Sequence, residues 1–162
     1  MSVLRRSRRI RRTRKGIEVS LPDEERDLLA ELSAQLRQML LDDEDPNLRR
    51  LYPNAYDDPR ADEEYRNMVR GSLVEGRLAA LDTLDATVRE KVLTEEQLGC
   101  WMGAVNNLRL VLGTRLDVRE DEIDFDPNAP DASARAVYHY LGWLLEEIVT
   151  VMSQGLPEPT SD

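Results

Sequence analysis

Few side chains in this sequence have the type and spacing that chemistry requires. His139, the one histidine, lies between two tyrosines in a segment with helical periodicity, and Cys100, the one cysteine, precedes Trp101. A histidine acts as a general base, and a cysteine as a nucleophile, only beside a group that orients or activates it. Neither has such a group near it in the sequence, so we interpret both as packed or half-exposed helix residues. We therefore predict that the protein is not an enzyme and assign no catalytic residue.

One stretch has a spacing that suits a metal ion. Asp124, Asp126 and Asn128 match positions one, three and five of a calcium-binding loop. However, Ala129 replaces the glycine of that loop, and Arg135 stands where a bidentate glutamate is needed. The single cysteine excludes a cysteine-based zinc site, and the sequence has neither a P-loop nor a dinucleotide-binding fingerprint. We therefore expect no metal and no cofactor.

The first fifteen residues, which we call the basic arm (1–15), are strongly cationic. They contain eight basic residues and no acidic one, whereas the whole chain carries a net charge of −10. The basic residues are Arg5, Arg6, Arg8, Arg9, Arg11, Arg12, Arg14 and Lys15. All 32 acidic residues lie at or after Glu18, so the remainder of the chain should repel nucleic acid unless the arm approaches first. The arm could bind an acidic partner protein, a second copy or nucleic-acid phosphates, or could simply keep the chain in solution or stay disordered.

Part of the basic arm is expected to form one edge of a short β-hairpin. Gly16 follows Arg14 and Lys15 and can adopt the positive φ that a tight turn needs. After it, Ile17 and Val19 alternate with polar residues, which is the period of a half-buried strand. We expect the arginines to occupy the outward positions of this hairpin.

From Pro22 onward the apolar periodicity is that of α-helices. The predicted helices cover residues 22–41, 46–51, 59–91, 94–116 and 131–153, the third with a break near Gly71 or Gly76. Thr94 and Gln97 form a capping box, and Leu93 and Leu98 form the hydrophobic staple around it. The sequence therefore predicts a mainly α fold, a single helical bundle of about five helices with a short N-terminal β-hairpin.

We expect one helical domain over residues 16–153 and a disordered tail over 154–162. Apolar residues make up 41% of the chain and aromatic residues 5%, a composition that suits packed helices. No apolar run is long enough to cross a bilayer, and none follows the basic arm as a secretory signal would require. A cytoplasmic location is therefore expected, and the single cysteine fits a reducing compartment.

The segment 101–116, WMGAVNNLRLVLGTRL, places polar residues beside an apolar helical stripe. Asn106 and Arg109 share one helical face, and a buried arginine must be paired and hydrogen-bonded. We expect an internal polar network there, with Asp58 or Glu64 as the carboxylate partner. The alternative is a guanidinium pocket that binds a carboxylate, a phosphate or a peptide end.

This segment, together with LRRLYPNAYDDP (48–59) and EYRNMVRGSL (64–73), resembles an uncharacterised actinobacterial family, catalogued only as a domain of unknown function. The positions that match the family pattern include Asp58, Arg66, Asn106, Arg109 and Arg115. The resemblance implies either that these arginines pin helices together or that they form a binding pocket. It also implies a pathway, because the family's genes commonly neighbour the gene of ClpS, the adaptor of the Clp protease.

The sequence allows two functions. The favoured one is a non-enzymatic adaptor or regulatory protein that binds another protein, in Clp-dependent proteolysis as the resemblance implies. The other is a nucleic-acid-binding regulator that uses the basic arm as a phosphate clamp. The arm lacks aromatic residues for base stacking, and no recognition helix is visible. Removal of residues 1–15 should abolish nucleic-acid binding but leave an interface on the helical body intact.

Overall fold

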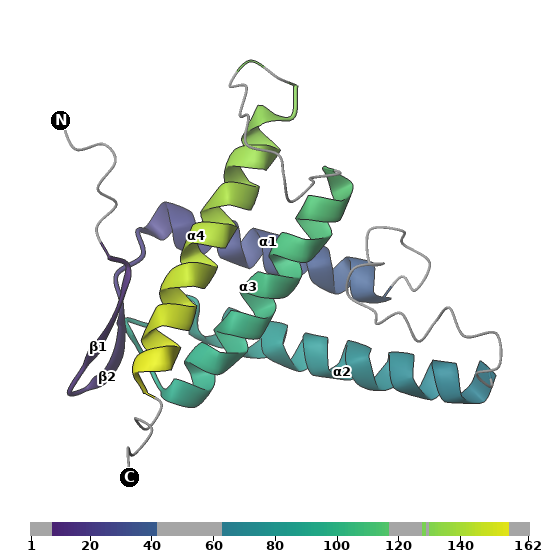
Figure 1. The fold of residues 1–162 in the computed structure, drawn as a ribbon, viewed down its shortest axis with the longest axis horizontal. Coiled ribbons are helices and arrows are strands. Elements are labelled where there is room, and N and C mark those ends of the chain that lie inside the picture. Colours follow the sequence, from purple (N-terminus) through teal and green to yellow (C-terminus); the bar gives the residue numbers. More distant parts are fainter. Residues whose placement is uncertain (1–7, 42–62, 117–127, 129, 156–162) are drawn as a thin grey trace, which may run out of the picture.

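The computed structural model describes residues 8–41, 63–116, 128 and 130–155, and for residues 63–70 it describes the backbone only. Its elements are, in chain order, β1 (Ile10–Thr13), β2 (Gly16–Val19), α1 (Asp23–Leu41), α2 (Glu63–Thr87), β3 (Val92–Leu93), α3 (Glu95–Arg115) and α4 (Ala132–Gln154). In Figure 1, α3 and α4 lie side by side in front of α1, and α2 extends along the lower edge. The predicted mainly α fold with an N-terminal hairpin is confirmed, with four helices in the described part of the chain. The other predicted helix, 46–51, lies outside the described residues.

The hairpin is present as predicted and carries a third strand that the sequence analysis missed. β1 and β2 pair antiparallel, with Thr13 opposite Gly16 across the Arg14–Lys15 turn. Gly16 has a φ of 132°, which favours glycine, and a Cβ there would lie 2.9 Å from the carbonyl oxygen of Leu93. β3 pairs with β2, with Leu93 opposite Ile17, so the sheet order is β1-β2-β3.

Local signals determine where two of the helices begin. α1 follows Pro22 and has three acidic residues in its first turn, where they meet the positive end of the helix dipole. α3 has the predicted capping box: Thr94 Oγ1 accepts a hydrogen bond from the Gln97 amide at 3.1 Å, and Gln97 Oε1 accepts one from the Thr94 amide at 2.9 Å. Leu93 and Leu98, the predicted staple, are both buried.

α2 is one continuous helix, so the break expected near Gly71 or Gly76 does not occur. Leucine, glutamate and arginine flank both glycines, and these strong helix formers offset a cost of about 1 kcal/mol per glycine. The helix ends before the predicted residue 91 because the chain turns after Thr87 to form β3. The Lys91 carbonyl accepts a hydrogen bond from the Val19 amide at 2.8 Å, which extends the pairing with β2.

A leucine-rich core joins the helices to the sheet. α3 lies at its centre and packs most extensively against α4 and α2. The Nε1 of the buried Trp101 donates a hydrogen bond to Thr87 Oγ1 at 2.7 Å, which satisfies the indole. The largest fully buried side chains are Trp101, Ile10, Ile17, Leu29, Leu36, Leu40, Leu81, Leu84, Leu93, Leu98 and Leu141. None of the described helices is long and apolar enough to span a bilayer.

A buried arginine ties α1 to the sheet and to the chain between α2 and β3. Arg26 is 5% exposed, and its guanidinium donates four hydrogen bonds to backbone carbonyls. The acceptors are the carbonyl oxygens of Val19, Leu21, Val88 and Glu90, at 2.6–2.9 Å. These dipoles replace the water that a buried cation loses.

A second arginine joins α1 to α2 at the surface. Arg37 donates to Asp82 Oδ1 at 2.6 Å and to Asp85 Oδ2 at 2.5 Å. The hydrogen bond to Asp82, followed by that to Asp85, raises the pKa of the Arg37 guanidinium. Because both carboxylates are exposed, we expect this link to contribute on the order of 1 kcal/mol or less to stability.

Candidate functional site

The residues predicted to form a polar network fall partly outside the described structure. Asp58 lies outside it, and Arg66 lies in the part of α2 for which only the backbone is described. Asn106 and Arg109 are half-buried on α3, and Arg115 is exposed in the last turn of that helix. The pairing of Arg109 with Asp58 or Glu64 therefore stays a prediction.

The described part of α3 does contain a polar contact, one residue away from the predicted one. Asn107 is 5% exposed, and its Oδ1 accepts a hydrogen bond from Arg77 Nη1 at 2.8 Å. The contact joins α2 to α3 inside the bundle. The structure thus uses Asn107 to hold the helices together, while Asn106 is half-buried.

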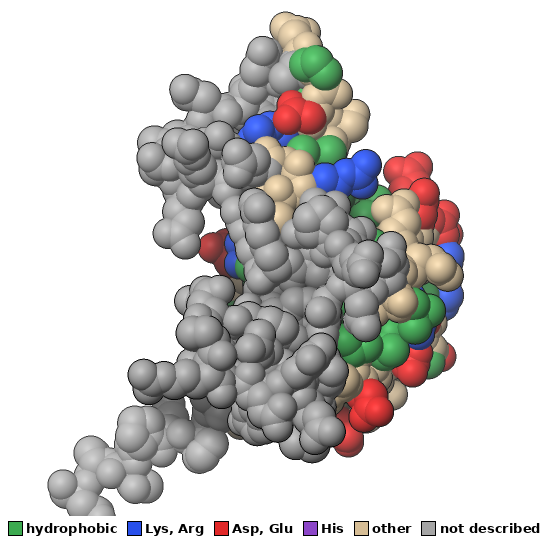
Figure 2. Space-filling model, turned by 90° about the vertical axis from the view of Figure 1, so that its right-hand side faces the viewer, with side chains coloured by type: hydrophobic (Ala, Val, Ile, Leu, Met, Phe, Trp, Pro, Cys, Tyr) green, Lys and Arg blue, Asp and Glu red, His purple; other side chains and the backbone are tan. Residues whose placement is uncertain are grey.

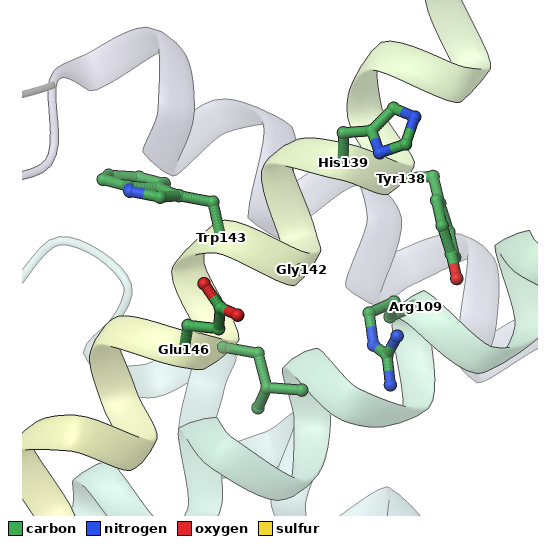
Figure 3. Close-up of a pocket in the computed structure, with 7 residues that line it drawn as sticks. Arg109, Tyr138, His139, Gly142, Trp143 and Glu146 are labelled. Atoms are coloured by element: carbon green, nitrogen blue, oxygen red, sulfur yellow. The ribbon is translucent and has the colours of Figure 1, made fainter. Parts of the chain in front are cut away.

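A hollow of about 490 Å³ lies where α3 and α4 meet at the surface. It is lined by Arg109, Tyr138, His139, Gly142, Trp143, Leu145 and Glu146. Figure 3 shows Arg109 rising from α3 and the ring of Tyr138 descending from α4 beside it. Gly142 keeps the hollow open: a Cβ there would lie 3.8 Å from Arg109 Cδ, so a long side chain at this position would occupy the space.

Arg109 gives the hollow a cation that pairs with no carboxylate of the described residues. Its Nε is buried and has no hydrogen-bond partner among the described residues, and none of these residues forms an ion pair with its guanidinium. A guanidinium carries five N–H donors in a planar fork, and a partly buried one loses solvation that only an acceptor can replace. The hollow therefore favours an anion.

Aromatic side chains form much of the remaining wall. Tyr138 and His139 meet edge to face with ring centroids 5.6 Å apart, and Tyr140 packs against Trp143 with centroids 5.8 Å apart. Trp143 is half-buried, whereas His139 is exposed at the rim. His139, which was predicted to be a packed or half-exposed helix residue, lies exposed at the edge of this hollow.

A smaller groove adjoins the hollow and shares Trp143 and Glu146 with it. Its volume is about 180 Å³, and Arg8 and Ile10 of the hairpin form its far side. At its base, Glu147 Oε1 accepts hydrogen bonds from the backbone amides of Arg9 at 2.8 Å and Ile10 at 3.4 Å. The groove therefore exists because Glu147 fastens the hairpin to α4.

The described part of the basic arm is less free than predicted. Arg9 pairs with Glu25 at 3.3 Å and Arg11 with Glu18 at 3.6 Å. Arg12 shares the inward face of the sheet with Ile10 and Ile17, where it binds Glu95 and, at 2.7 Å, the carbonyl oxygen of Val151. The expectation that the arginines all point outward is thus wrong, because Arg12 alternates in phase with the buried residues.

In the described part of the arm, three cations remain available to a partner. Arg8, Arg14 and Lys15 are exposed and form no ion pair with a described residue. Arg5 and Arg6 lie outside the described residues. Free positive charge is therefore confined to the start and the turn of the hairpin in the part of the arm that the structure describes.

The other candidate residues form no metal or catalytic cluster in the described part of the chain. Cys100 is half-buried on α3 and lines a separate depression with Thr87 and Gln97. Among the described residues, no three histidine, cysteine, aspartate or glutamate side chains come together as a metal site would need. Asp124 and Asp126, which have calcium-loop spacing, lie outside those residues.

Comparison with known proteins places the chain in a family. The model of a domain of unknown function, DUF2017, matches residues 7–152. The chain belongs to the DUF2017 family. This agrees with the resemblance to an actinobacterial family of unknown function that the sequence motifs carried.

Named relatives of this DUF2017 chain are mycobacterial. The oxidative stress regulator AosR of Mycobacterium tuberculosis and that of Mycobacterium bovis are each 32% identical to it, over 67% of this chain and 58% of the relative. A putative oxidative stress regulator AosR of Mycobacterium leprae is 31% identical, over 67% of this chain and 59% of the relative. The chain thus spans less than two thirds of the length of these relatives. No solved structure matches it.

Two features of the candidate site escaped sequence reasoning. Gly142 opens the hollow opposite Arg109, yet the two residues lie on different helices and only the packing of α3 on α4 brings them together. Trp143 lines both the hollow and the groove, and its place between them depends on where the hairpin docks. The cluster of aromatic residues over 138–143 was the one sequence signal that could have indicated this face.

Proposed function

We propose that this protein is a non-enzymatic regulatory protein that acts by binding another protein. The observation that carries the proposal is the guanidinium of Arg109, which has no counter-ion among the described residues and lies beside Tyr138 and Trp143 in an open hollow. Arginine, tyrosine and tryptophan are the residues that most often dominate binding energy at protein interfaces. The rim residue His139 and the exposed Glu146 would supply the polar border that such interfaces have.

The mycobacterial relatives support the regulatory part of the proposal. They carry the name oxidative stress regulator, and we propose a role of the same kind for this chain. The family resemblance adds components of the Clp protease as the partners to look for first. A second copy of the chain is the other protein partner that the opposite charges of its segments allow.

The experiment that tests the proposal places a photo-crosslinking amino acid in the full chain, in the cells from which it comes. Position 139 reports on the hollow, and Gln35, exposed on α1, is the control position. We expect one main protein adduct from position 139 and none from position 35, with the yield changed by an oxidant. The identity of the adduct then decides between a Clp component, a second copy and another protein.

Two variants connect the adduct to the site. Arg109→Met should remove it because the cation in the hollow is lost. Arg115→Met, on the exposed last turn of the same helix, should leave it unchanged. Equal adducts from both crosslinking positions, or an adduct insensitive to Arg109→Met, would show that the hollow is not the binding site.

Nucleic-acid binding through the arm is the alternative, and one observation favours it. The described residues contain 16 of the 22 basic residues but only 17 of the 32 acidic ones, so this part of the molecule is nearly neutral. The repulsion of nucleic acid that the sequence predicts therefore comes largely from segments outside the described residues. Against the alternative, the described surface in Figure 2 has basic side chains scattered among acidic ones, without a continuous basic stripe on that face.

A further inference from the structure

We propose that the hollow between α3 and α4 binds a carboxylate that carries an apolar group. The inference rests on the proposed function, because it names the chemistry of the partner at the contact. A carboxylate at a peptide end, one on an acidic side chain and one on a small acid share this chemistry. Four features of the hollow carry the inference: its cation, its neighbouring carboxylate, its apolar wall and its size.

The cation selects the charge of the ligand. In the part of the chain that the structure describes, the buried Arg109 Nε has no hydrogen-bond partner and the guanidinium forms no ion pair. The planar fork of arginine matches the two oxygens of a carboxylate, and such a pair is stronger where water is partly excluded. An anion that enters the hollow therefore supplies the acceptors that the described residues do not provide.

The neighbouring carboxylate limits how much charge the ligand carries. Glu146 lines the same hollow and makes no ion pair with Arg109. It repels a dianionic phosphate about twice as strongly as it repels a singly charged carboxylate at the same distance. The balance of one guanidinium, unpaired among the described residues, and one carboxylate thus favours a monoanion.

The apolar wall and the volume select the rest of the ligand. Trp143, Leu145 and the ring of Tyr138 line the space, and Gly142 contributes no side chain to it. Its volume of about 490 Å³ lies within the range of small-molecule sites and is large enough for an aromatic or aliphatic group. A carboxylate on Arg109 would place such a group on the face formed by α4.

Tryptophan fluorescence offers a direct test with the full chain. Trp101 is fully buried and hydrogen-bonded to Thr87, so its emission should not respond, whereas Trp143 lines the hollow. The probe is N-acetyl-phenylalanine, a carboxylate with a benzyl group, and its matched control is the neutral N-acetyl-phenylalanine amide. We expect the acid to change the emission with a dissociation constant on the order of 1 mM and the amide to have no effect.

Variants assign the signal to the proposed contacts. Arg109→Met should weaken binding of the acid at least about tenfold, and Arg109→Lys by less, because it keeps the charge but loses the fork. Gly142→Leu should abolish binding by filling the hollow. Gly76→Leu, at an exposed helical glycine with nothing within 4 Å, is its control and should bind normally. Circular dichroism and the unfolding midpoint verify that each variant is folded.

The outcomes separate this inference from the proposed function. Equal binding of acid and amide, effective competition by inorganic phosphate, or no signal from the acid would overturn the carboxylate inference. If the acid fails to bind but Gly142→Leu still removes the crosslinked partner, the proposed function stands and the chemistry named for the hollow is wrong. A peptide that binds only with a free C-terminus, compared with its amidated form, identifies a peptide end as the source.

Discussion

Arg26 Nη1 lies 2.6 Å from the carbonyl oxygen of Val88, which is 62 positions away along the chain. The same guanidinium also reaches the carbonyls of Val19, Leu21 and Glu90, and all of its described hydrogen bonds go to backbone oxygens. A single side chain of α1 thus holds the end of β2 and the connection from α2 to β3 in place. The sheet that carries the basic arm depends on this contact.

Replacing Arg26 should destabilise the whole domain. Arg26→Met leaves several buried carbonyls without a donor, and we expect the free energy of unfolding to fall by about 3 kcal/mol. Arg26→Lys should cost less, because an ammonium group still donates hydrogen bonds but lacks the planar fork. Urea denaturation followed by circular dichroism measures both changes. A loss below about 1 kcal/mol for Arg26→Met would mean that water replaces the guanidinium.

Two glycines should respond in opposite directions to alanine. Gly16→Ala places a Cβ at a φ of 132° and within 2.9 Å of the Leu93 carbonyl oxygen, so we expect a loss of about 2 kcal/mol. Gly76→Ala, in the open middle of α2, should stabilise the protein by about 0.5–1 kcal/mol. Thermal unfolding of the two variants beside the parent provides the comparison. The same sign for both would refute the geometry described for the turn.

Glu147 should control how firmly the hairpin is attached. Glu147→Ala removes the acceptor of the Arg9 and Ile10 amides, and we expect amide exchange in β1 and β2 to become about tenfold faster. Glu146→Ala, at the exposed neighbouring position, is the matched control and should leave the exchange unchanged. Hydrogen–deuterium exchange resolved to residues 10–19 distinguishes the two. Similar exchange in both variants would assign the attachment to Arg12 and the packing of Ile10 instead.

The salt dependence of DNA binding, where binding is found, should reveal how many cations of the arm are free. Eight contacts with phosphates would give a log–log slope of about −7 on duplex DNA. Arg8, Arg14 and Lys15 alone predict about −2.7, and the addition of Arg5 and Arg6 predicts about −4.5. We expect fluorescence anisotropy at several salt concentrations to give a slope between about −2.7 and about −4.5. A slope near −7 would require Arg9, Arg11 and Arg12 to leave their carboxylates.

The elements that sequence reasoning located are those with strong local signals. The Arg14–Lys15 turn with its glycine, the capping box of Thr94 and Gln97, and the helical periodicity of α1 and α4 each depend on neighbours in the chain. β3 escaped because two residues, Val92 and Leu93, are too few to show a strand period.

The contacts of α3 were harder to predict because that helix is buried on a wide face. It packs against both α2 and α4, so apolar residues surround much of it and the helical phase is poorly defined. For this reason the sequence pointed to Asn106, whereas Asn107 is the buried one of the two. Arg26 was missed for a different reason: it lies among acidic residues at the start of α1, where an arginine is ordinarily exposed.

The hairpin's attachments have a consequence for how the chain is made. Arg12 binds the Val151 carbonyl, and the Arg9 amide binds Glu147, so each contact joins residues almost 140 positions apart. During translation the hairpin leaves the ribosome long before α4 exists, and contacts over such separations form late. β1 is therefore secured to α4 only late, and until then Arg12, whose partners lie on α3 and α4, is free to meet whatever acidic surface the nascent chain encounters.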